Sequence, residues 1–429
     1  MPVMSITLII AAVVMFVAGV PIAAALGLAS IVVLFVFQPI PNFMMIAQLF
    51  SEACASFVLL AVPLFILVGV LMERGSMGRQ LIDFSMALVG WVKGGLGAVN
   101  IVGSFLFGGV SGSSVADAAT FSALLVPRMK AENYPADYAA AVTVTSSTLS
   151  TIRPPSIQLV LAAAATNQSI GKALTGALLP SVVVLLVMLI PNYFISKKRG
   201  YGKDHPFSLS TLWLECKRCW TALFAPVIIM GVILTGLATP TEAAGIAVLY
   251  ILIVDGLVFR ELSLGDIWES LKKTAGITSA ILLIASASAL MNFIIAFESI
   301  PQVLSASLAS VPGGQVGFMI VFVLMVIVIG CVLDATPATL IFCPLFLPAA
   351  VNLGIDPTHF ILLWTMGVAL GMTTPGYGVC VFSVAAITRV PIAAMVIESI
   401  PFYLATIAAI AIVALFPQIV LCIPELLGM

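Results

Sequence analysis

Charged residues are scarce in this sequence. Asp, Glu, Lys and Arg together make up 8% of the 429 residues, whereas hydrophobic residues make up 62%, and the mean hydropathy is +1.23. So few charges cannot cover the surface of a soluble domain of this length, which excludes a soluble protein. Many apolar runs reach the roughly 20 residues that a spanning helix needs, so we expect an integral membrane protein. Segments of alternating polarity are missing, which excludes an outer-membrane barrel.

Signatures of several other protein classes are also missing. No Walker A phosphate-binding loop is present, so we expect that the chain does not hydrolyse ATP itself. The seven cysteines are scattered, and Cys216 and Cys219, in a predicted basic loop, lack a second pair or a nearby histidine to complete a metal site. His205 and His359 are predicted to lie singly in loops. No histidine cluster or nucleophile–base pair supports a membrane enzyme, and no nucleic-acid partner is expected.

The second half of the chain repeats the first at an offset of 221 residues. Three prolines show this offset: Pro127, Pro154 and Pro180 recur as Pro348, Pro375 and Pro401. The apolar segments around them are interrupted at matching positions by Gly, Ser, Thr and Pro. Secondary transporters use repeats with interrupted helices to build a binding site at the membrane midplane. The pattern therefore predicts an inverted-repeat transporter.

The apolar runs predict an all-α membrane protein with ten spans, two re-entrant hairpins and three interfacial arms. The spans are 3–19, 22–37, 56–72, 137–168, 173–196, 219–237, 241–259, 276–297, 357–388 and 392–416. Spans 137–168 and 357–388 are expected to break near 150–155 and 372–376. The hairpins cover 95–128 and 314–350, because each stretch breaks in the middle into halves too short to cross. The arms are 38–55, 80–94 and 298–312.

Basic residues set the predicted orientation. The loops 197–218 and 260–273 are rich in Lys and Arg, which assigns them to the cytoplasm. By span counting the two hairpins then enter from opposite faces, and both termini are expected in the periplasm. The N-terminus lacks a basic n-region and a cleavage site, so residues 1–36 are expected to remain as membrane helix.

Four polar segments inside the apolar regions are candidates for the binding site: 111–117, 145–156, 334–339 and 371–376. Carbonyls at the C-terminal ends of half-helices suit Na+, whereas N–H groups at N-terminal ends suit a carboxylate. The predicted substrate ligands are Ser111, Ser114, Thr151, Arg153, Thr336 and Thr373.

Several of these residues have alternative interpretations. Ser114 and Asp117 have the spacing of a capping box, so Asp117 either caps the second arm of the hairpin or binds a cation. Thr336 followed by Pro337 fits an N-cap, and Glu242 is expected to cap the helix that starts near residue 241.

Two charged side chains are predicted to lie at membrane depth. Asp334 is a candidate cation ligand, because a carboxylate there is costly without a partner. Arg153 either holds a substrate carboxylate or pairs internally with Asp117 or Asp334.

Eight short motifs, taken in order, resemble the large membrane subunit of TRAP transporters, the tripartite ATP-independent periplasmic family. They are GVPIAA (19–24), AVPLF (61–65), SGSSVAD (111–117), ALLVP (123–127), PPSI (154–157), LATPTEAA (237–244), DATP (334–337) and GIDP (354–357). The resemblance runs essentially from end to end. The chain departs from it with Ser-Thr-Ile-Arg before the first Pro-Pro pair and with Pro375-Gly376 at the second break.

The resemblance implies a Na+-coupled, elevator-type importer of organic acids in the bacterial inner membrane. It also implies two partners, a small four-helix membrane subunit on a separate chain and a periplasmic substrate-binding protein. About two Na+ ions are expected. The first would be held by Gly108, Ser113, Ser150, Arg153 and Pro155. The second would be held by Gly330, Asp334, Gly371, Thr374 and Tyr377.

The predicted organisation follows the repeats. Residues 1–94 are mostly scaffold, 95–168 and 314–390 form the two repeats of a moving transport domain, 169–313 connect them, and 391–429 hold the C-terminal span. A self-sufficient Na+–dicarboxylate symporter of related architecture is the main alternative, and an ion channel is a further one. Sialic acid, C4-dicarboxylates and sugar acids all fit such a site.

Overall fold

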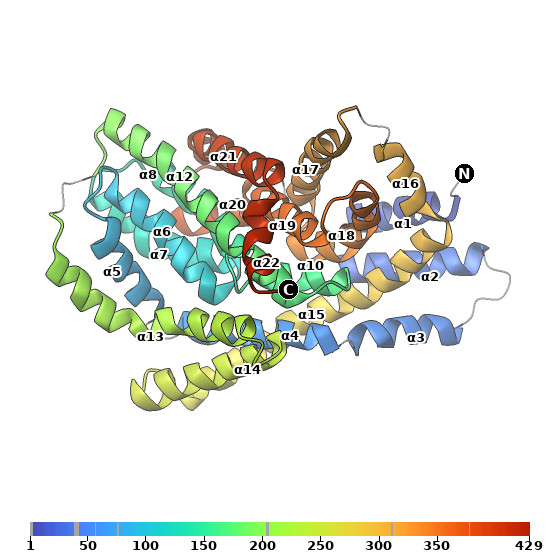
Figure 1. Cartoon of the computed structure of the whole chain (residues 1–429), viewed down its shortest axis with the longest axis horizontal. Helices are drawn as coiled ribbons and strands as arrows, with labels where there is room; N and C mark the ends of the chain where they lie inside the picture. The colour runs from blue at the N-terminus through green and yellow to red at the C-terminus, as the bar shows by residue number, and fades with distance from the viewer. Residues whose placement is uncertain are drawn as a thin grey trace.

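The structure is a computed structural model that describes residues 3–37, 43–55, 57–74, 77–202, 206–309, 312–376 and 378–429 (Figure 1). Within these residues the chain forms helices and no strands. Tyr377 and His205 lie outside the described residues.

Five α-helices and a 3-10 turn precede the first hairpin. They are α1 (Val3–Val17), α2 (Ile22–Phe37), α3 (Phe43–Cys54), η1 (Phe57–Leu60), α4 (Ala61–Arg74) and α5 (Met77–Val89). The Glu298 carboxylate accepts hydrogen bonds from the backbone N–H groups of Met4 (2.9 Å) and Ser5 (2.6 Å). A negative charge at this position stabilises the positive N-terminal end of α1. The start of the described chain is thus tied to the end of a helix nearly 300 residues later.

The first repeat consists of a hairpin and a broken helix, as predicted. The hairpin is α6 (Gly95–Ser111) and α7 (Ser114–Ala131), and the broken helix is α8 (Ala136–Ser146), α9 (Thr148–Ile152) and α10 (Ile157–Ala165). The rings of Phe107 and Phe121 lie 5.8 Å apart between the two arms, which run antiparallel. Gly112 turns the chain at the tip with a φ of 60°, a left-handed conformation that favours glycine.

The second repeat has the same parts. Its hairpin is α17 (Gly314–Val332) and α18 (Ala335–Asn352), and its broken helix is α19 (Pro357–Thr373) and α20 (Val379–Thr388). The Gln315 side chain donates a hydrogen bond of 2.6 Å to the carbonyl of Leu353, which closes the base of this hairpin. The prediction of two re-entrant hairpins and two broken helices is therefore confirmed.

The two hairpins enter from opposite faces of the molecule. The first broken helix starts at Ala136, beside the base of the first hairpin. It continues into α11 (Ile170–Gly176), where Lys172 forms an ion pair of 3.6 Å with Asp356 at the base of the second hairpin. The chain thus crosses the molecule between the two bases, which makes the repeats inverted.

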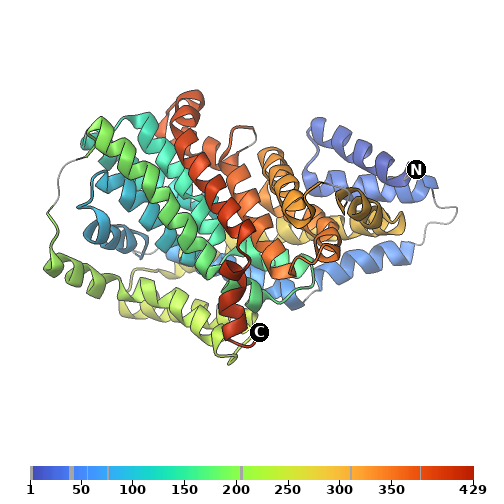
Figure 2. The same ribbon diagram turned by 45° about the horizontal axis from the view of Figure 1, so that its top comes forward.

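The remaining helices connect and surround the repeats. They are α12 (Leu178–Arg199), α13 (Leu209–Leu234), α14 (Pro240–Ile251) with a π-helical end η2 (Leu252–Val258), α15 (Leu264–Phe297), α16 (Ile300–Ala309), α21 (Ile392–Leu415) and α22 (Gln418–Leu426). Helices α12 and α21 pack side by side along one face (Figure 2). Helix α14 begins with a capping box of Thr239 and Glu242, so Glu242 caps this helix as predicted.

Two helices extend into segments that were predicted as basic loops. Ser263 and Asp266 form a capping box, so α15 begins at Leu264 and its 34 residues span about 51 Å. Ser208 caps α13, which places Cys216 and Cys219 on a helix and corrects their assignment to a loop. His359 likewise lies buried on α19 and bonds to the carbonyl of Val413, not in a loop.

Among the described residues, seven helical segments are long and apolar enough to cross a membrane. Two of the seven are α17 and α18, the arms of the second hairpin, so length and composition alone do not separate spans from hairpins. The chain is a multi-pass membrane protein.

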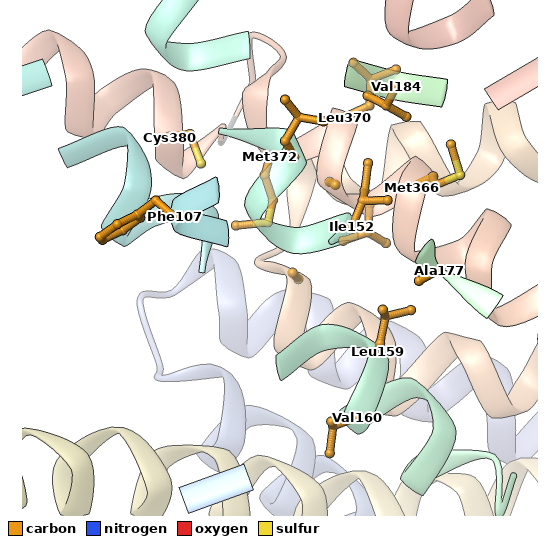
Figure 3. Close-up of a cluster of buried hydrophobic side chains, with 14 of the residues drawn as sticks. Phe107, Ile152, Leu159, Val160, Ala177, Val184, Met366, Leu370, Met372 and Cys380 are labelled. Atoms are coloured by element: carbon orange, nitrogen blue, oxygen red, sulfur yellow. The ribbon is translucent and has the colours of Figure 1, made fainter. Parts of the chain in front are cut away.

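Both repeats share one hydrophobic core (Figure 3). Ile152 and Leu159 from the first broken helix lie in it with Met366, Leu370 and Met372 from the second. Helix α10 packs against α18 of the second hairpin, and α20 packs against α7 of the first. The repeats therefore interlock, each placing half of its broken helix against the hairpin of the other.

Candidate functional site

The tip of the first hairpin packs directly on the first helix break. A Cβ atom added at Gly108 would lie 2.5 Å from the Cα of Ser150, closer than real Cβ contacts. A Cβ at Gly112 would lie 3.1 Å from the carbonyl oxygen of Pro155. The peptide between Pro154 and Pro155 is cis. Backbone thus meets backbone, which brings together the predicted cation ligands Gly108, Ser150 and Pro155.

Hydroxyl groups join this tip to the broken helix. The Oγ of Ser114 lies 2.5 Å from the Oγ1 of Thr151 and 2.6 Å from the carbonyl oxygen of Ser147. The Ser150 hydroxyl donates to the carbonyl of Ser104 (3.1 Å). Ser114 and Thr151, both predicted substrate ligands, are therefore buried and bonded to the protein.

Two other predicted serines at this tip are open to a cavity. Ser111 and Ser113 line a space of about 600 Å³ between the hairpin and helices α4 and α15. Ser113 is also the N-cap of α7, since its Oγ accepts a hydrogen bond of 3.4 Å from the N–H of Ala116. Of the predicted ligands in this hairpin, these two are the ones placed to meet a solute.

Arg153 binds backbone oxygens of the hairpin. Its Nη1 donates to the carbonyls of Phe105 (2.5 Å) and Leu106 (2.8 Å), and its guanidinium lies 4.4 Å from the centroid of the Phe105 ring. Among the residues that the structure describes, no carboxylate lies within 4.0 Å of it, so the alternative of an internal ion pair with Asp117 or Asp334 is not formed. The physical reason is that helix carbonyls satisfy the buried guanidinium.

Asp117 is fully buried, and neither of its carboxylate oxygens makes a hydrogen bond of normal geometry. The side chains of Ser104 and Ser150 lie beside it. The predicted capping box with Ser114 is not formed, because Ser113 caps α7 and Asp117 lies one turn inside the helix. A buried carboxylate without a partner is costly, so the site calls for a proton or a cation.

The second half-site is built the same way. A Cβ at Gly371 would lie 2.6 Å from the Cα of Gly330, so α17 and α19 also cross at backbone contact. The Thr374 hydroxyl donates to the carbonyl of Gly371 and lies 2.7 Å from the Sγ of Cys331. Thr373 is buried, and its carbonyl accepts a hydrogen bond of 2.5 Å from the Tyr403 hydroxyl.

Asp334, not Thr336, caps the second arm of this hairpin. The Oδ2 of Asp334 accepts a hydrogen bond of 3.4 Å from the N–H of Thr336, and α18 begins at Ala335. The expectation of an N-cap at Thr336 is therefore corrected. A carboxylate is as good an N-cap as a hydroxyl, and its charge also interacts favourably with the helix end.

Corresponding positions in the two half-sites have the same backbone roles. Ser113 and Asp334, 221 residues apart, are both N-caps of the second hairpin arm. Arg153 and Thr374, again 221 apart, are both extended C-cap residues at a helix break. The inverted repeat thus fixes where helix ends lie, while the side chains at those ends differ.

Gln158 connects the two halves, and sequence reasoning missed it. Its side-chain amide donates to the Oγ1 of Thr336 (3.4 Å), and its Oε1 accepts from the hydroxyl of Thr339 (3.3 Å). Trp364 in turn donates from Nε1 to Thr339 at 2.9 Å. The feature of the sequence that could have identified Gln158 is its position in the first turn of α10, directly after the Pro-Pro-Ser break.

This donor set suits a monovalent cation better than a transition metal. Within the described residues no three His, Cys, Asp or Glu side chains form a metal cluster. Helices α9 and α19 instead end at the breaks, where last-turn carbonyls lack intrahelical partners. Asp117 adds two buried oxygens without a partner beside Ser150. Carbonyl, hydroxyl and carboxylate oxygens are what Na+ sites in interrupted helices use.

Comparison with known proteins gives consistent relatives. Residues 9–419 match the family described as "Tripartite ATP-independent periplasmic transporter, DctM component". The chain is 32% identical over 380 residues to the sialic acid TRAP transporter large permease protein SiaM of Vibrio cholerae, covering 89% of each. It is 29% identical over 425 residues to the C4-dicarboxylate TRAP transporter large permease protein DctM of Rhodobacter capsulatus, covering 96% of each.

A solved structure shows the same fold. The YdaH transporter of Alcanivorax borkumensis superposes with a TM-score of 0.60 at 15% sequence identity, over 88% of each chain. At that identity the likeness concerns the fold alone. The family match over nearly the whole sequence goes further: this chain belongs to the DctM family, the large permease component of tripartite ATP-independent periplasmic transporters.

Proposed function

We propose that this chain is the large membrane subunit of a Na+-coupled importer of an organic acid. Relatives at about 30% identity are named for sialic acid and for C4-dicarboxylates, and both substrates carry carboxylates. The hydroxyls and helix N-termini at the two hairpin tips suit such an anion.

One observation supports the proposal most strongly. Two hairpin tips, entering from opposite faces, each meet a helix break at backbone contact, at Gly108–Ser150 and at Gly330–Gly371. A bound ion at either contact would touch both the tip and the break. Ion binding would therefore favour one arrangement of the tip, which is what coupling requires.

The residues that would hold Na+ lie at these contacts. Gly108, Ser113, Ser150, Arg153 and Pro155 would act at the first, mostly through backbone oxygens, and Asp117 is added to them. Gly330, Asp334, Gly371 and Thr374 would act at the second. A bound Na+ would supply positive charge that favours binding of an anion.

The mechanism and partners follow from the same proposal. The interlocked repeats 95–168 and 314–390 would move as a transport domain against the surrounding helices. A separate small membrane subunit would complete the scaffold, and a periplasmic binding protein would deliver the substrate. The membrane would be the bacterial inner membrane, with both termini in the periplasm.

Uptake into proteoliposomes tests this function. The chain and its small partner would be reconstituted and given labelled N-acetylneuraminate or succinate, with and without an inward Na+ gradient and the periplasmic protein. We expect uptake that needs both the Na+ gradient and the periplasmic protein. Uptake that needs Na+ alone would move the protein to the self-sufficient symporters, and uptake driven by protons alone would overturn the proposed Na+ sites.

Replacing Asp334 with Asn should weaken Na+ dependence and leave the fold intact. Asn caps a helix as well as Asp, so thermal stability should change by less than about 0.5 kcal/mol. Loss of the charge should raise the Na+ concentration for half-maximal uptake about tenfold, the equivalent of roughly 1.4 kcal/mol of attraction. Unchanged Na+ dependence would show that the cap is the only role of this carboxylate.

Replacing Arg153 with Lys should slow transport without changing the apparent substrate affinity. A lysine keeps the charge but cannot bond two carbonyls and stack on Phe105 in the same way. We expect a loss of about 1–3 kcal/mol in stability and a lower maximal rate at unchanged KM. A raised KM at an unchanged maximal rate would instead make Arg153 a substrate ligand. Uptake kinetics and thermal unfolding measure both quantities.

A further inference from the structure

The cavity at the first hairpin tip extends toward the charged surface of the molecule. Ser111 and Ser113 of the hairpin tip line it, and so does Lys273 of α15. A second cavity of about 480 Å³ adjoins it, because Glu73 and Thr120 line both. We call the two adjoining cavities the passage, and residues of α7 such as Ala119 lie on its wall. Organic acids fit sites of this size.

Charged side chains line both cavities of this passage. Lys273 forms an ion pair of 2.7 Å with Glu73, which joins α15 to α4 at the point that both cavities share. Arg79 is exposed on the wall of the second cavity, and no ion pair joins it to any part of the chain that the structure describes. Arg74 and Glu261 line this second cavity as well. Basic groups therefore line both cavities, each together with a carboxylate.

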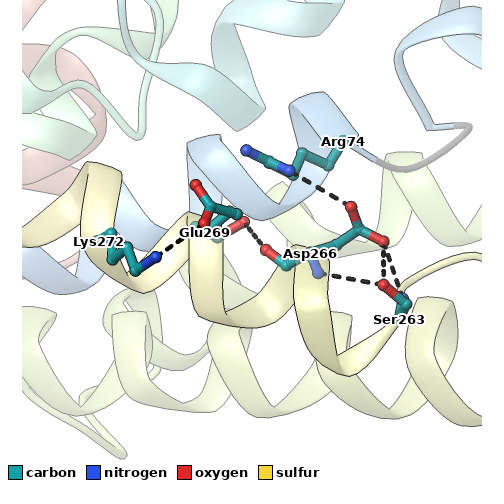
Figure 4. Close-up of polar contacts among 6 residues, drawn as sticks. Arg74, Ser263, Asp266, Glu269 and Lys272 are labelled. Atoms are coloured by element: carbon teal, nitrogen blue, oxygen red, sulfur yellow. Dashed lines mark hydrogen bonds and ion pairs between the residues drawn. The ribbon is translucent and has the colours of Figure 1, made fainter.

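The two neighbouring lysines of α15 have different surroundings. Lys272 pairs with Glu269 at 2.9 Å on its own helix, and Arg74 pairs with Asp266 at 3.3 Å close by (Figure 4). Lys272 does not line either cavity. Consecutive residues on a helix face directions about 100° apart, so Lys273 lines the passage and Lys272 does not, although both side chains are about half exposed.

We propose that this passage conducts the organic anion between the hairpin tip and the surface, and that Lys273 is its intermediate binding group. The substrate carboxylate takes the place of Glu73 on Lys273, then moves outward to Arg79. The ion pair keeps Lys273 from trapping the anion, because Lys273 pairs with Glu73 again as soon as the anion leaves. The identity of the solute in this inference rests on the proposed function. The preference of the passage for anions does not.

Thiol modification measures that preference without transport. A cysteine introduced as Ala119→Cys would be reacted in the purified protein with anionic sulfonatoethyl methanethiosulfonate and with cationic trimethylammonioethyl methanethiosulfonate. Peptide mass spectrometry would follow that site alone, since Cys54 and Cys422 are also exposed. Lys273→Gln should lower the ratio of the modification rate with the anionic reagent to that with the cationic reagent about fivefold. Lys272→Gln should leave this ratio unchanged. Glu73→Gln should raise it.

An equal ratio in Lys273→Gln and Lys272→Gln would overturn the proposal. Where uptake is established, Lys273→Gln should also raise the KM for succinate about fivefold and Lys273→Arg should restore it. A chain that shows the thiol result but takes up no organic acid would keep the anion passage and refute the proposed substrate. The two failures are therefore distinguishable.

Discussion

Asp117→Asn should abolish most of the stabilisation that we expect from the proposed binding of Na+. The carboxylate is fully buried, neither of its oxygens makes a hydrogen bond of normal geometry, and the hydroxyl groups of Ser104 and Ser150 lie beside it. A ligand that binds only the folded protein raises its stability by mass action, about 2.7 kcal/mol at a hundredfold excess over its Kd. Removing the charge should remove that gain. Thermal unfolding in NaCl and in choline chloride measures it.

The same substitution should leave the protein no less stable when Na+ is absent. An uncharged amide of the same shape relieves the cost of an unpaired buried carboxylate, which is several kcal/mol per ion. Asp255 offers a matched control, because it too is fully buried with both oxygens unpartnered, but it lies in η2, far along the chain from both breaks. Asp255→Asn should leave the stabilisation by Na+ unchanged. If Asp117→Asn keeps it as well, the Asp117 carboxylate holds a proton and not Na+.

Gly371→Ala should reduce transport at least tenfold and destabilise the fold by about 1–3 kcal/mol. The added Cβ would lie 2.6 Å from the Cα of Gly330 and 2.8 Å from the carbonyl oxygen of Ile327. Both are backbone atoms that no side-chain rotation can move. The two helices must separate, which displaces the second hairpin tip from its break. Uptake kinetics and thermal unfolding test the two effects.

A glycine elsewhere provides the control for this substitution. Gly276 lies on α15, and a Cβ there would meet no atom within 4 Å. Gly276→Ala should be neutral or stabilising by up to about 1 kcal/mol, because alanine favours a helix. Equal behaviour of the two variants would mean that the Gly330–Gly371 contact is not needed for transport.

Local patterns predicted the helix breaks and mispredicted several helix ends. Helices α9 and α19 end at Ile152 and Thr373, within the breaks predicted near 150–155 and 372–376, because proline and glycine act on their own backbone. Helices α13 and α15 begin earlier than the predicted spans, because the Lys and Arg residues that indicate basic loops also favour helices. Ser263 and Asp266 carried the helix start signal instead.

The partners of polar side chains could not be predicted. The spacing of Ser114 and Asp117 fits a capping box, but the turn at Gly112 makes Ser113 the cap and turns Asp117 into the protein. Arg153 meets carbonyls of α6 that lie almost 50 residues earlier, and Gln158 meets Thr336 and Thr339 of the opposite repeat. Such contacts depend on how helices pack, which no local pattern contains.

The sequence by itself determined the membrane class, the inverted repeat and the places where helices break. Hydropathy and backbone restriction act residue by residue, so they can be read along the chain. The tertiary structure alone decided that tip and break touch at backbone distance, that Asp117 lacks a partner, and that Lys273 lines a passage while Lys272 does not. These features arise from the close packing of helices that are distant in sequence. In such packing, a small displacement changes which side chains and backbone groups are in contact.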